Sequence, residues 1–162
     1  MEKLKASLAA SGFEQIQTYI QSGNVIFRSK LRNSDTVSGI IEQKIRADFG
    51  LQITVVSRTV DEMGAIIKAN PFLQQRGVDP TKLHVTFLSE APVTSSLGKL
   101  AALTNAGDEF RHSGREIYLY CPNGYGRTKL SNNALEKLLT ARATTRNWKT
   151  VRQLYEMALS YR

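Results

Sequence analysis

Cysteine and histidine are both scarce in this 162-residue sequence, which contains Cys121 alone and the two histidines His84 and His112. One cysteine excludes an intrachain disulfide and a cysteine-based zinc site. Two histidines this far apart, without a carboxylate motif beside them, are a weak signal for any other metal. The sequence therefore predicts no metal site and no bound cofactor.

Long apolar runs are also missing. No stretch approaches the roughly 18 residues that a membrane span needs. Residues 1–13 read as an amphipathic helix, without the continuous apolar segment of a signal peptide. With 41% hydrophobic and 22% charged residues, the chain can form an ordinary core. We expect a cytoplasmic protein without membrane contacts, folded as one domain or two small ones.

Acidic residues are few relative to basic ones. The chain has 22 Lys and Arg against 14 Asp and Glu, a formal net charge of +8. The excess lies toward the C-terminus, because residues from Arg111 onward hold ten basic side chains and three acidic ones. This excess favours a polyanionic partner such as nucleic acid. A basic surface that only maintains solubility is an equally good interpretation.

Hydrophobic periodicity and turn residues predict a succession of helices and strands. One helix should open with a capping box, Thr59 and Glu62, and end before Pro71. The predicted helices cover residues 2–10, 35–49, 59–70, 92–103 and 130–139, with a last helix after Asn147. The predicted strands cover residues 16–20, 24–27, 52–57, 82–88, 109–112, 115–121 and 143–146.

The order of these elements predicts an α+β fold with two ferredoxin-like subdomains. Residues 82–162 follow the order β-α-β-β-α-β and add a C-terminal helix. Residues 1–70 follow the same order without its first strand, and residues 71–81 form a turn-rich linker. Strand 52–57 would have no neighbour in its own sheet, which predicts an unpaired edge that pairs with another molecule, as in a homodimer.

The stretch CPNGYGRTKLSNN, residues 121–133, has the composition of an anion-binding loop. Glycine lets backbone N–H groups approach an anion, a helix start offers unpaired donors, and basic side chains add charge. The spacing fits neither a Walker A loop nor the dinucleotide fingerprint. A structural turn braced by Arg127 is the alternative. The candidate residues are Asn123, Gly124, Gly126, Arg127, Thr128, Lys129 and Ser131.

A second wall for this site is predicted at residues 144–148. Arg146 lies at a helix start, where a cation opposes the helix dipole, so we expect an acidic partner or a bound anion beside it. Asn147 is the expected N-cap. Both residues are added to the candidate anion site. The alternative is that Arg146 pairs with a carboxylate and that Trp148 is a core aromatic.

The hairpin Gln21-Ser22-Gly23-Asn24 carries a weaker hypothesis, since its amides suit a polar ligand. Such a turn more often only sets the register of a hairpin. Tyr118 and Tyr120 share one strand face, which raises a further alternative of RNA bases stacking on an open sheet, without the usual signature.

Candidates for catalysis are few. Cys121 precedes the basic loop, which would stabilise a thiolate, but a lone cysteine at a strand end is more often a small buried hydrophobe. Asp108 and Glu109 are an acid–base candidate whose side chains should point to opposite faces. No catalytic residue is assigned.

Several of these segments resemble a bacterial family named only as domain of unknown function 1697. They are residues 18–27, 83–87, 114–121, 121–131 and 144–148, which occur in the expected order along essentially the whole chain. The resemblance implies a cytoplasmic α+β protein with two ferredoxin-like subdomains, and it implies no activity. Members usually begin with an extra strand and an Arg-Gly loop, whereas this sequence opens at the helix that follows them.

Three functional hypotheses remain open. The first is a binding module for nucleic acid or a phosphorylated small molecule, using the basic loop. The second is an enzyme that acts on a phosphorylated or acidic small molecule at the same loop. The third is a protein-interaction scaffold whose basic surface meets an acidic partner.

Overall fold

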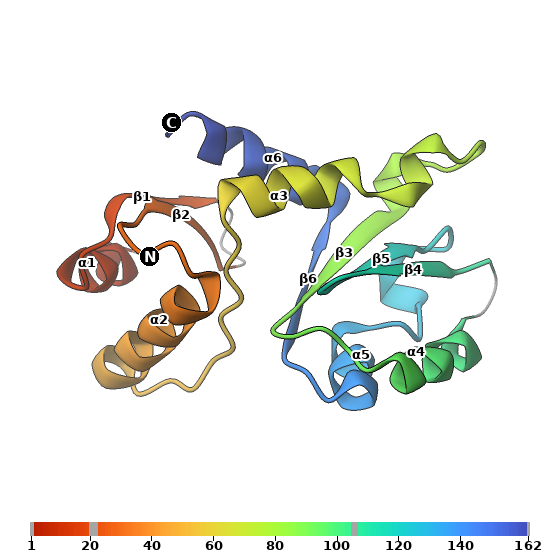
Figure 1. Cartoon of the computed structure of the whole chain (residues 1–162), viewed down its shortest axis with the longest axis horizontal. Coiled ribbons are helices and arrows are strands. Elements are labelled where there is room, and N and C mark those ends of the chain that lie inside the picture. Colours follow the sequence, from red (N-terminus) through yellow and green to blue (C-terminus); the bar gives the residue numbers. More distant parts are fainter. Residues whose placement is uncertain (1, 20–22, 105–106, 162) are drawn as a thin grey trace. The chain divides into compact units, whose positions relative to one another are not determined.

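The computed structural model describes residues 2–19, 23–104 and 107–161. The protein is α+β, with one antiparallel sheet of two strands and one of four (Figure 1). The chain divides into two compact units, unit 1 (Met1–Gly64 with Arg152–Arg162) and unit 2 (Ala65–Val151). This division differs from the expected linker at residues 71–81, because residues 65–81 group with unit 2 and the end of the last helix groups with unit 1.

Unit 1 is built from two helices and one hairpin, together with parts of two further helices. Its core consists of apolar side chains of the first helix, the residue just before the hairpin and the second helix: Leu8, Phe13, Val37, Ile41 and Ile45. The elements are α1 (Glu2–Ala10), β1 (Glu14–Tyr19), β2 (Asn24–Arg28), α2 (Ser34–Phe49), the first part of α3 (Val60–Lys68) and the last part of α6 (Trp148–Leu159).

Local signals decide where the helices of unit 1 begin and end. The Asn33 side chain accepts from the Thr36 N–H before α2, and Gly50 closes that helix in the left-handed conformation. The predicted capping box of α3 is confirmed. The Thr59 N–H donates to Glu62 Oε2 (2.7 Å), and the Glu62 N–H donates to Thr59 Oγ1 (3.1 Å).

The predicted strand at residues 52–57 is wrong. Residues 51–59 form no regular secondary structure, and β2 pairs with β1 alone. Helix α2 supplies hydrogen-bond partners instead: the Val55 N–H donates to Glu42 Oε1 (2.9 Å) and the Ser57 N–H to Ser38 Oγ (3.0 Å). A strand needs a ladder partner, and without one this segment satisfies its backbone with side chains.

Unit 2 holds the four-stranded antiparallel sheet, in the order β4-β5-β3-β6. Strand β3 pairs with both β5 and β6, and β5 also pairs with β4. The main elements are β3 (Leu83–Leu88), α4 (Thr94–Leu100), β4 (Glu109–Ser113), β5 (Glu116–Tyr120), α5 (Asn132–Leu139) and β6 (Ala143–Asn147). The short 3-10 helices are η1 (Pro71–Gln74), η2 (Pro80–Lys82), η3 (Ala101–Leu103) and η4 (Tyr125–Arg127).

Both faces of this sheet are covered. On one face, Leu100 of α4 and Leu135 and Leu139 of α5 share a core with Leu88 and Ile117 of the strands. On the other face, the Tyr118 hydroxyl donates to Ile66 O (2.7 Å) and the Tyr120 ring lies against Phe72. Tyr118 is buried, so the alternative of an open sheet face that stacks RNA bases is wrong.

Among the residues that the structure describes, no helix is both long enough and apolar enough to cross a membrane.

Two helical glycines provide a matched test of packing in unit 1. A Cβ at Gly39 of α2 would meet nothing within 4 Å, whereas one at Gly64 of α3 would lie 3.0 Å from Tyr155 Oη. We expect Gly39→Ala to stabilise the protein by about 0.5–1 kcal/mol, because alanine restricts the unfolded chain and favours helix. Gly64→Ala should raise the free energy of unfolding by less, or lower it, because the added methyl group would crowd Tyr155. Urea unfolding measures both changes.

A Tyr155→Leu background supplies the control for this pair, because it removes the crowding atoms. In that background, the two glycine substitutions should change the free energy of unfolding by more similar amounts. An equal gain from both substitutions in the wild-type background would contradict the packing between Gly64 and Tyr155.

Candidate functional site

The candidate loop joins β5 to α5 and is held by its own backbone. The Gly124 N–H donates to Cys121 O (2.9 Å), the Arg127 N–H to Gly124 O (3.2 Å) and the Thr128 N–H to Tyr125 O (3.2 Å). Gly124 adopts a φ of 95°, which suits glycine, and Ser131 is the N-cap of α5. These three amides already donate within the loop, so they are not free to bind an anion.

Two side chains brace the loop. Thr128 Oγ1 donates to Asp108 Oδ2 (2.7 Å) and accepts from the Leu130 N–H (3.1 Å). The Tyr125 hydroxyl accepts from the Asn132 N–H (2.8 Å). The Tyr125 ring also stacks on His84 with a centroid distance of 4.7 Å. The loop is therefore fixed by a threonine and a tyrosine, and the expected bracing role does not fall to Arg127.

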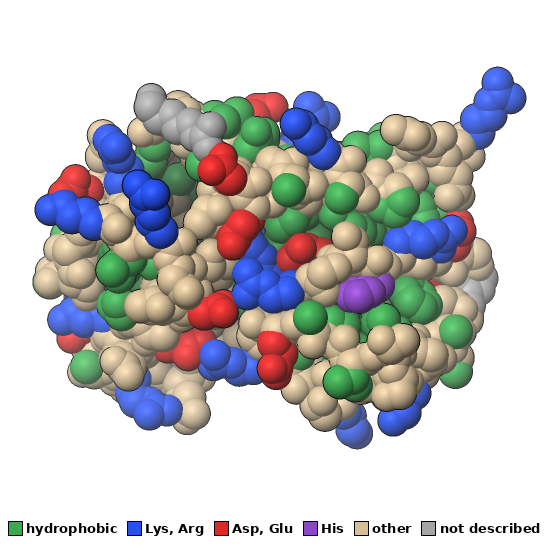
Figure 2. Space-filling model, in the orientation of Figure 1, with side chains coloured by type: hydrophobic (Ala, Val, Ile, Leu, Met, Phe, Trp, Pro, Cys, Tyr) green, Lys and Arg blue, Asp and Glu red, His purple; other side chains and the backbone are tan. Residues whose placement is uncertain are grey.

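Arg127 and Lys129 are the two exposed cations of the loop. Neither forms an ion pair with a carboxylate in the part of the chain that the structure describes. Asn123 and Gly126 are exposed beside them, whereas Thr128 and Ser131 are half-buried. On the face seen in Figure 2, basic and acidic side chains are interspersed. That face therefore carries no continuous basic patch.

Arg146 forms hydrogen bonds within its own strand. Arg146 is half-buried, and its guanidinium donates to Thr144 Oγ1 (2.7 Å) and Thr145 O (2.9 Å) of its own strand. The neighbouring Thr145 hydroxyl donates to Asn132 Oδ1 of α5 (2.9 Å). Because successive side chains of a strand alternate, Arg146 points to the sheet face away from α5. Asn147 caps α6 as expected, accepting from the Thr150 N–H (2.8 Å).

In the second candidate site, Asn24 has a structural contact. Its side-chain amide donates to Tyr19 O across the hairpin (3.0 Å), and the residue is buried. Gly23 adopts a φ of 85°. Gln21 and Ser22 lie outside the described residues.

Sequence reasoning missed the polar residues beneath the loop. Thr86 and Thr145 share a hydrogen bond between their hydroxyls (2.8 Å), and Thr145 in turn reaches Asn132. The Asn132 side chain also donates to Ala143 O (3.0 Å) and to Glu136 Oε1 (3.2 Å). No local motif signals this network, because its members come from β3, α5 and β6. Its contacts tie the start of α5 to the sheet.

The candidate catalytic residues are buried or are engaged in contacts within the protein. Cys121 is fully buried, and burial raises the pKa of its thiol to about 11; Asp108 acts in the same direction and the Thr128 hydroxyl in the opposite one. Asp108 is buried and accepts a hydrogen bond from the Thr128 hydroxyl. The Glu109 carboxylate forms an ion pair with exposed Arg111, with 3.3 Å between Arg111 Nη2 and Glu109 Oε1. No group of three or more potential metal ligands occurs among the described residues.

Comparison with known proteins identifies a family without an assigned function. A family model described as "Protein of unknown function (DUF1697)" matches residues 1–118. The match ends within β5, so the loop lies beyond it, although the sequence motifs extended the resemblance over the whole chain. No curated protein matches.

A solved structure, that of the conserved bacterial protein SP0830 from Streptococcus pneumoniae, is similar over 98% of this chain and 88% of its own. The TM-score is 0.71 and the sequence identity is 18%. This likeness establishes a shared fold.

The buried thiol makes one prediction. We expect native Cys121 to resist iodoacetamide at pH 8, because the thiolate that reacts is disfavoured in the core. Mass spectrometry should find it alkylated only in denaturant. Rapid, complete alkylation of the folded protein would contradict the burial, with free cysteine in the same buffer as the reactivity control.

The burial of His84 leads to a prediction about how stability depends on pH. It is partly buried against Tyr125, and burial lowers its pKa, with the Lys82 backbone acting in the opposite direction. The unfolded chain, with a histidine pKa of about 6.5, therefore binds a proton more readily. The stability that neutral His84 contributes is present above that value and is lost as the pH falls through the folded pKa.

The matched variant for this test is His84→Gln, which cannot titrate. Its urea midpoint should fall less between pH 7 and pH 5 than that of the wild-type protein. Parallel curves for the two proteins would show that His84 does not contribute to the pH dependence.

Proposed function

We propose that this chain, which belongs to the family described as protein of unknown function (DUF1697), is a binding module for a phosphate-bearing ligand. The ligand is a nucleic acid or a phosphorylated small molecule, held at residues 123–131 of unit 2. The observation that carries the proposal is the pair Arg127 and Lys129. Both are exposed cations without an ion pair among the described residues, on a loop that other side chains already hold in place.

The rigidity of the loop supports this proposal. Thr128 and Tyr125 immobilise the backbone on both sides of Arg127, and the N-cap Ser131 immobilises the backbone after Lys129. An anion that meets the two cations does not have to order the loop first, so less of the interaction energy is lost on binding. Because five backbone N–H groups between residues 124 and 132 donate within the protein, the chief donors to a phosphate are side chains.

The charge of unit 2 also supports an anionic ligand. Residues 65–151 hold twelve Lys and Arg against six Asp and Glu, a formal charge of +6, whereas the rest of the chain has ten against eight. A field of this sign raises the local concentration of polyanions and their rate of encounter. It does not choose between nucleic acid and a small phosphorylated molecule.

Binding is favoured over catalysis by the surroundings of the candidate acids and nucleophile. The Asp108 carboxylate accepts a hydrogen bond from Thr128, and Cys121 lies in the core with a pKa of about 11. Neither is available to a ligand at Arg127 and Lys129. A protein-interaction role for the same cations remains an outcome of the binding experiment below.

We also infer that unit 2 is a ferredoxin-like subdomain and that unit 1 is an incomplete copy. The β-α-β-β-α-β order of unit 2 and its strand order β4-β5-β3-β6 support the first inference. The succession α1, β1, β2, α2 in unit 1 supports the second, since it repeats the elements that follow β3 in unit 2. Cytoplasmic location is proposed on the single cysteine alone.

The binding proposal is tested with the double variant Arg127→Ala/Lys129→Ala. We expect it to bind a fluorescent single-stranded oligonucleotide about tenfold more weakly in anisotropy titrations at moderate salt. Its log–log salt slope should be shallower by about 1.4, because two phosphate contacts are removed. Inorganic tripolyphosphate should compete with the oligonucleotide on the wild-type protein.

The matched control is Lys99→Ala/Lys137→Ala, which removes the same charge from exposed positions of α4 and α5. It should bind nearly as well as the wild-type protein. Equal losses of affinity in both double variants would show that the effect comes from net charge alone and not from the loop. Failure of the wild-type protein to bind either the oligonucleotide or tripolyphosphate would overturn the proposal, and binding of an acidic protein alone would favour the scaffold role.

A further inference from the structure

His84 is a half-buried histidine in contact with the loop of the proposed phosphate site. It is the second residue of β3 and lies opposite Leu119 of β5 and Asn147 of β6. Its ring stacks on the ring of Tyr125, with an interplanar angle of 22°. Tyr125 begins the single 3-10 turn that ends at Arg127. One ring contact therefore joins His84 to the turn that carries the first of the two exposed cations.

The imidazole of His84 lacks the partners that usually hold a buried histidine. Its Nδ1 is enclosed and makes no hydrogen bond of normal geometry, whereas Nε2 is not enclosed and also lacks a side-chain partner among the described residues. A buried polar atom without a partner is uncommon in folded proteins. Burial lowers the pKa of the ring, and the Lys82 backbone, with a smaller effect, raises it. The ring is therefore neutral near pH 7 and still has a nitrogen to offer a ligand.

The carboxylates on the elements that pack around this histidine are engaged elsewhere. Glu136 of α5 accepts from the Ala143 N–H, at the far end of β6. Beneath the loop, the Asp108 carboxylate accepts from the Thr128 hydroxyl. Glu116 of β5 projects from the opposite face of the sheet, because successive side chains of a strand alternate. None of these three acids is placed to balance a charge on the imidazole.

The other charged groups on the adjoining segments are cations. They are Lys82 just before β3, Arg127 and Lys129 of the loop, and Lys149 in the first turn of α6. His84 itself forms no ion pair among the described residues. A proton on its ring therefore has no counterion in the free protein. An anion held by the two loop cations would supply one, and an opposite charge nearby favours the protonated form of a histidine.

We propose that His84 joins Arg127 and Lys129 as the third contact of the phosphate site and binds the anion in its protonated form. This inference rests on the proposed function and adds to it a linkage between ligand and proton. An anion that prefers the imidazolium must also raise the pKa of His84, because the two binding events are reciprocal. The free protein has a His84 pKa below the usual 6.5, so affinity for the anion should rise as the pH falls toward that value and through it.

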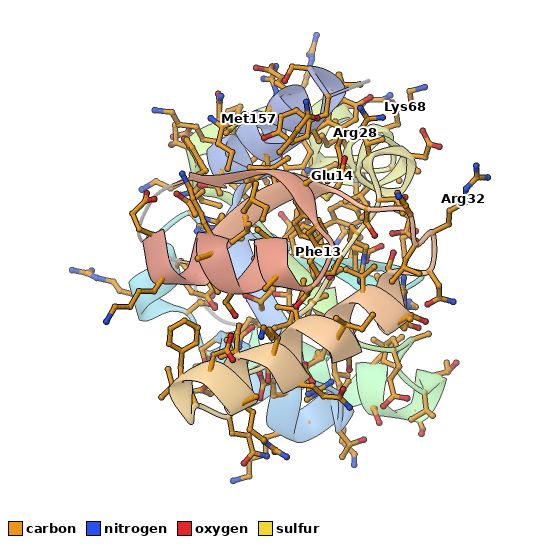
Figure 3. The ribbon with its side chains drawn as sticks, turned by 90° about the vertical axis from the view of Figure 1, so that its left-hand side faces the viewer. Phe13, Glu14, Arg28, Arg32, Lys68 and Met157 are labelled. Carbon is orange, nitrogen blue, oxygen red and sulfur yellow. The ribbon has the colours of Figure 1, made fainter. Side chains whose placement is uncertain are left out.

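Two basic side chains of unit 1 provide a comparison without a histidine. Arg28 and Arg32 are exposed and form no ion pair among the described residues. Figure 3 shows Arg32 extending away from the fold. Both histidines of the chain, His84 and His112, belong to unit 2. An anion bound at Arg28 and Arg32 would therefore show no dependence on pH that is linked to a histidine.

The probe is a labelled oligo-dT without a terminal phosphate, because neither its phosphodiesters nor thymine titrates between pH 5.5 and pH 7.5. In anisotropy titrations the wild-type protein should bind it about fivefold more tightly at pH 5.5 than at pH 7.5, part of the roughly tenfold gain that a rise of about 1 in the pKa of His84 gives. His84→Gln should lose most of this gain. His112→Gln, the matched control at an exposed position of β4, should keep it, and so should Arg28→Ala/Arg32→Ala. Circular dichroism at both pH values checks that each protein is folded.

Proton NMR of the wild-type protein measures the same linkage without a substitution. Saturating oligo-dT should raise the pKa of His84 by about 1, while the His112 signal follows the same curve with and without the oligonucleotide. The two Gln variants assign the two signals.

An unchanged pKa of His84, or an equal pH dependence of binding in His84→Gln and the wild-type protein, would overturn the inference. If Arg127→Ala/Lys129→Ala still weakened binding in that case, the phosphate site would stand without His84. A wild-type protein that binds no oligo-dT at either pH would overturn this inference together with the nucleic-acid form of the proposed function.

Discussion

Backbone hydrogen bonding is the constraint on which the rest of this structure depends. In unit 2, β3 is paired on both sides, and in the edge strands β4 and β6 the carbonyls of Phe110 and Thr145 accept from the guanidinium of the following arginine. In unit 1, residues 51–59 have no strand to pair with, and side chains of α2 accept the Val55 and Ser57 amides. Both arrangements give backbone donors or acceptors a partner.

The same constraint decides what the candidate loop can offer a ligand. A glycine-rich turn before a helix suggests a cradle of amides, but here the amides of Gly124, Arg127 and Thr128 close the turn on itself. Contact with an anion would therefore depend mainly on the side chains of the loop. Thr128 and Tyr125 fix the loop, while Arg127 and Lys129 remain exposed, so the side chains that hold the loop are not those proposed to bind an anion. The loop suits a contact based on charge more than a site shaped around one phosphate.

The family relationship bears unequally on the chain. The family model matches residues 1–118, whereas the loop at residues 123–131 lies beyond the match. The shared fold with the conserved bacterial protein SP0830 extends over nearly the whole chain. Fold alone does not assign a ligand.

The sequence by itself determined the features whose physical causes are local. Asn33 and Gly50 delimit α2, Thr59 and Glu62 open α3, and Asn147 opens α6, because each cap involves residues within a few positions of one another. Tertiary structure decided the rest. It left residues 52–57 without a ladder, turned Arg146 away from α5, and joined Thr128 to Asp108, 20 positions earlier in the chain. A strand exists only beside a neighbour and a polar side chain turns toward its partner, and both lie at distances that no local pattern encodes.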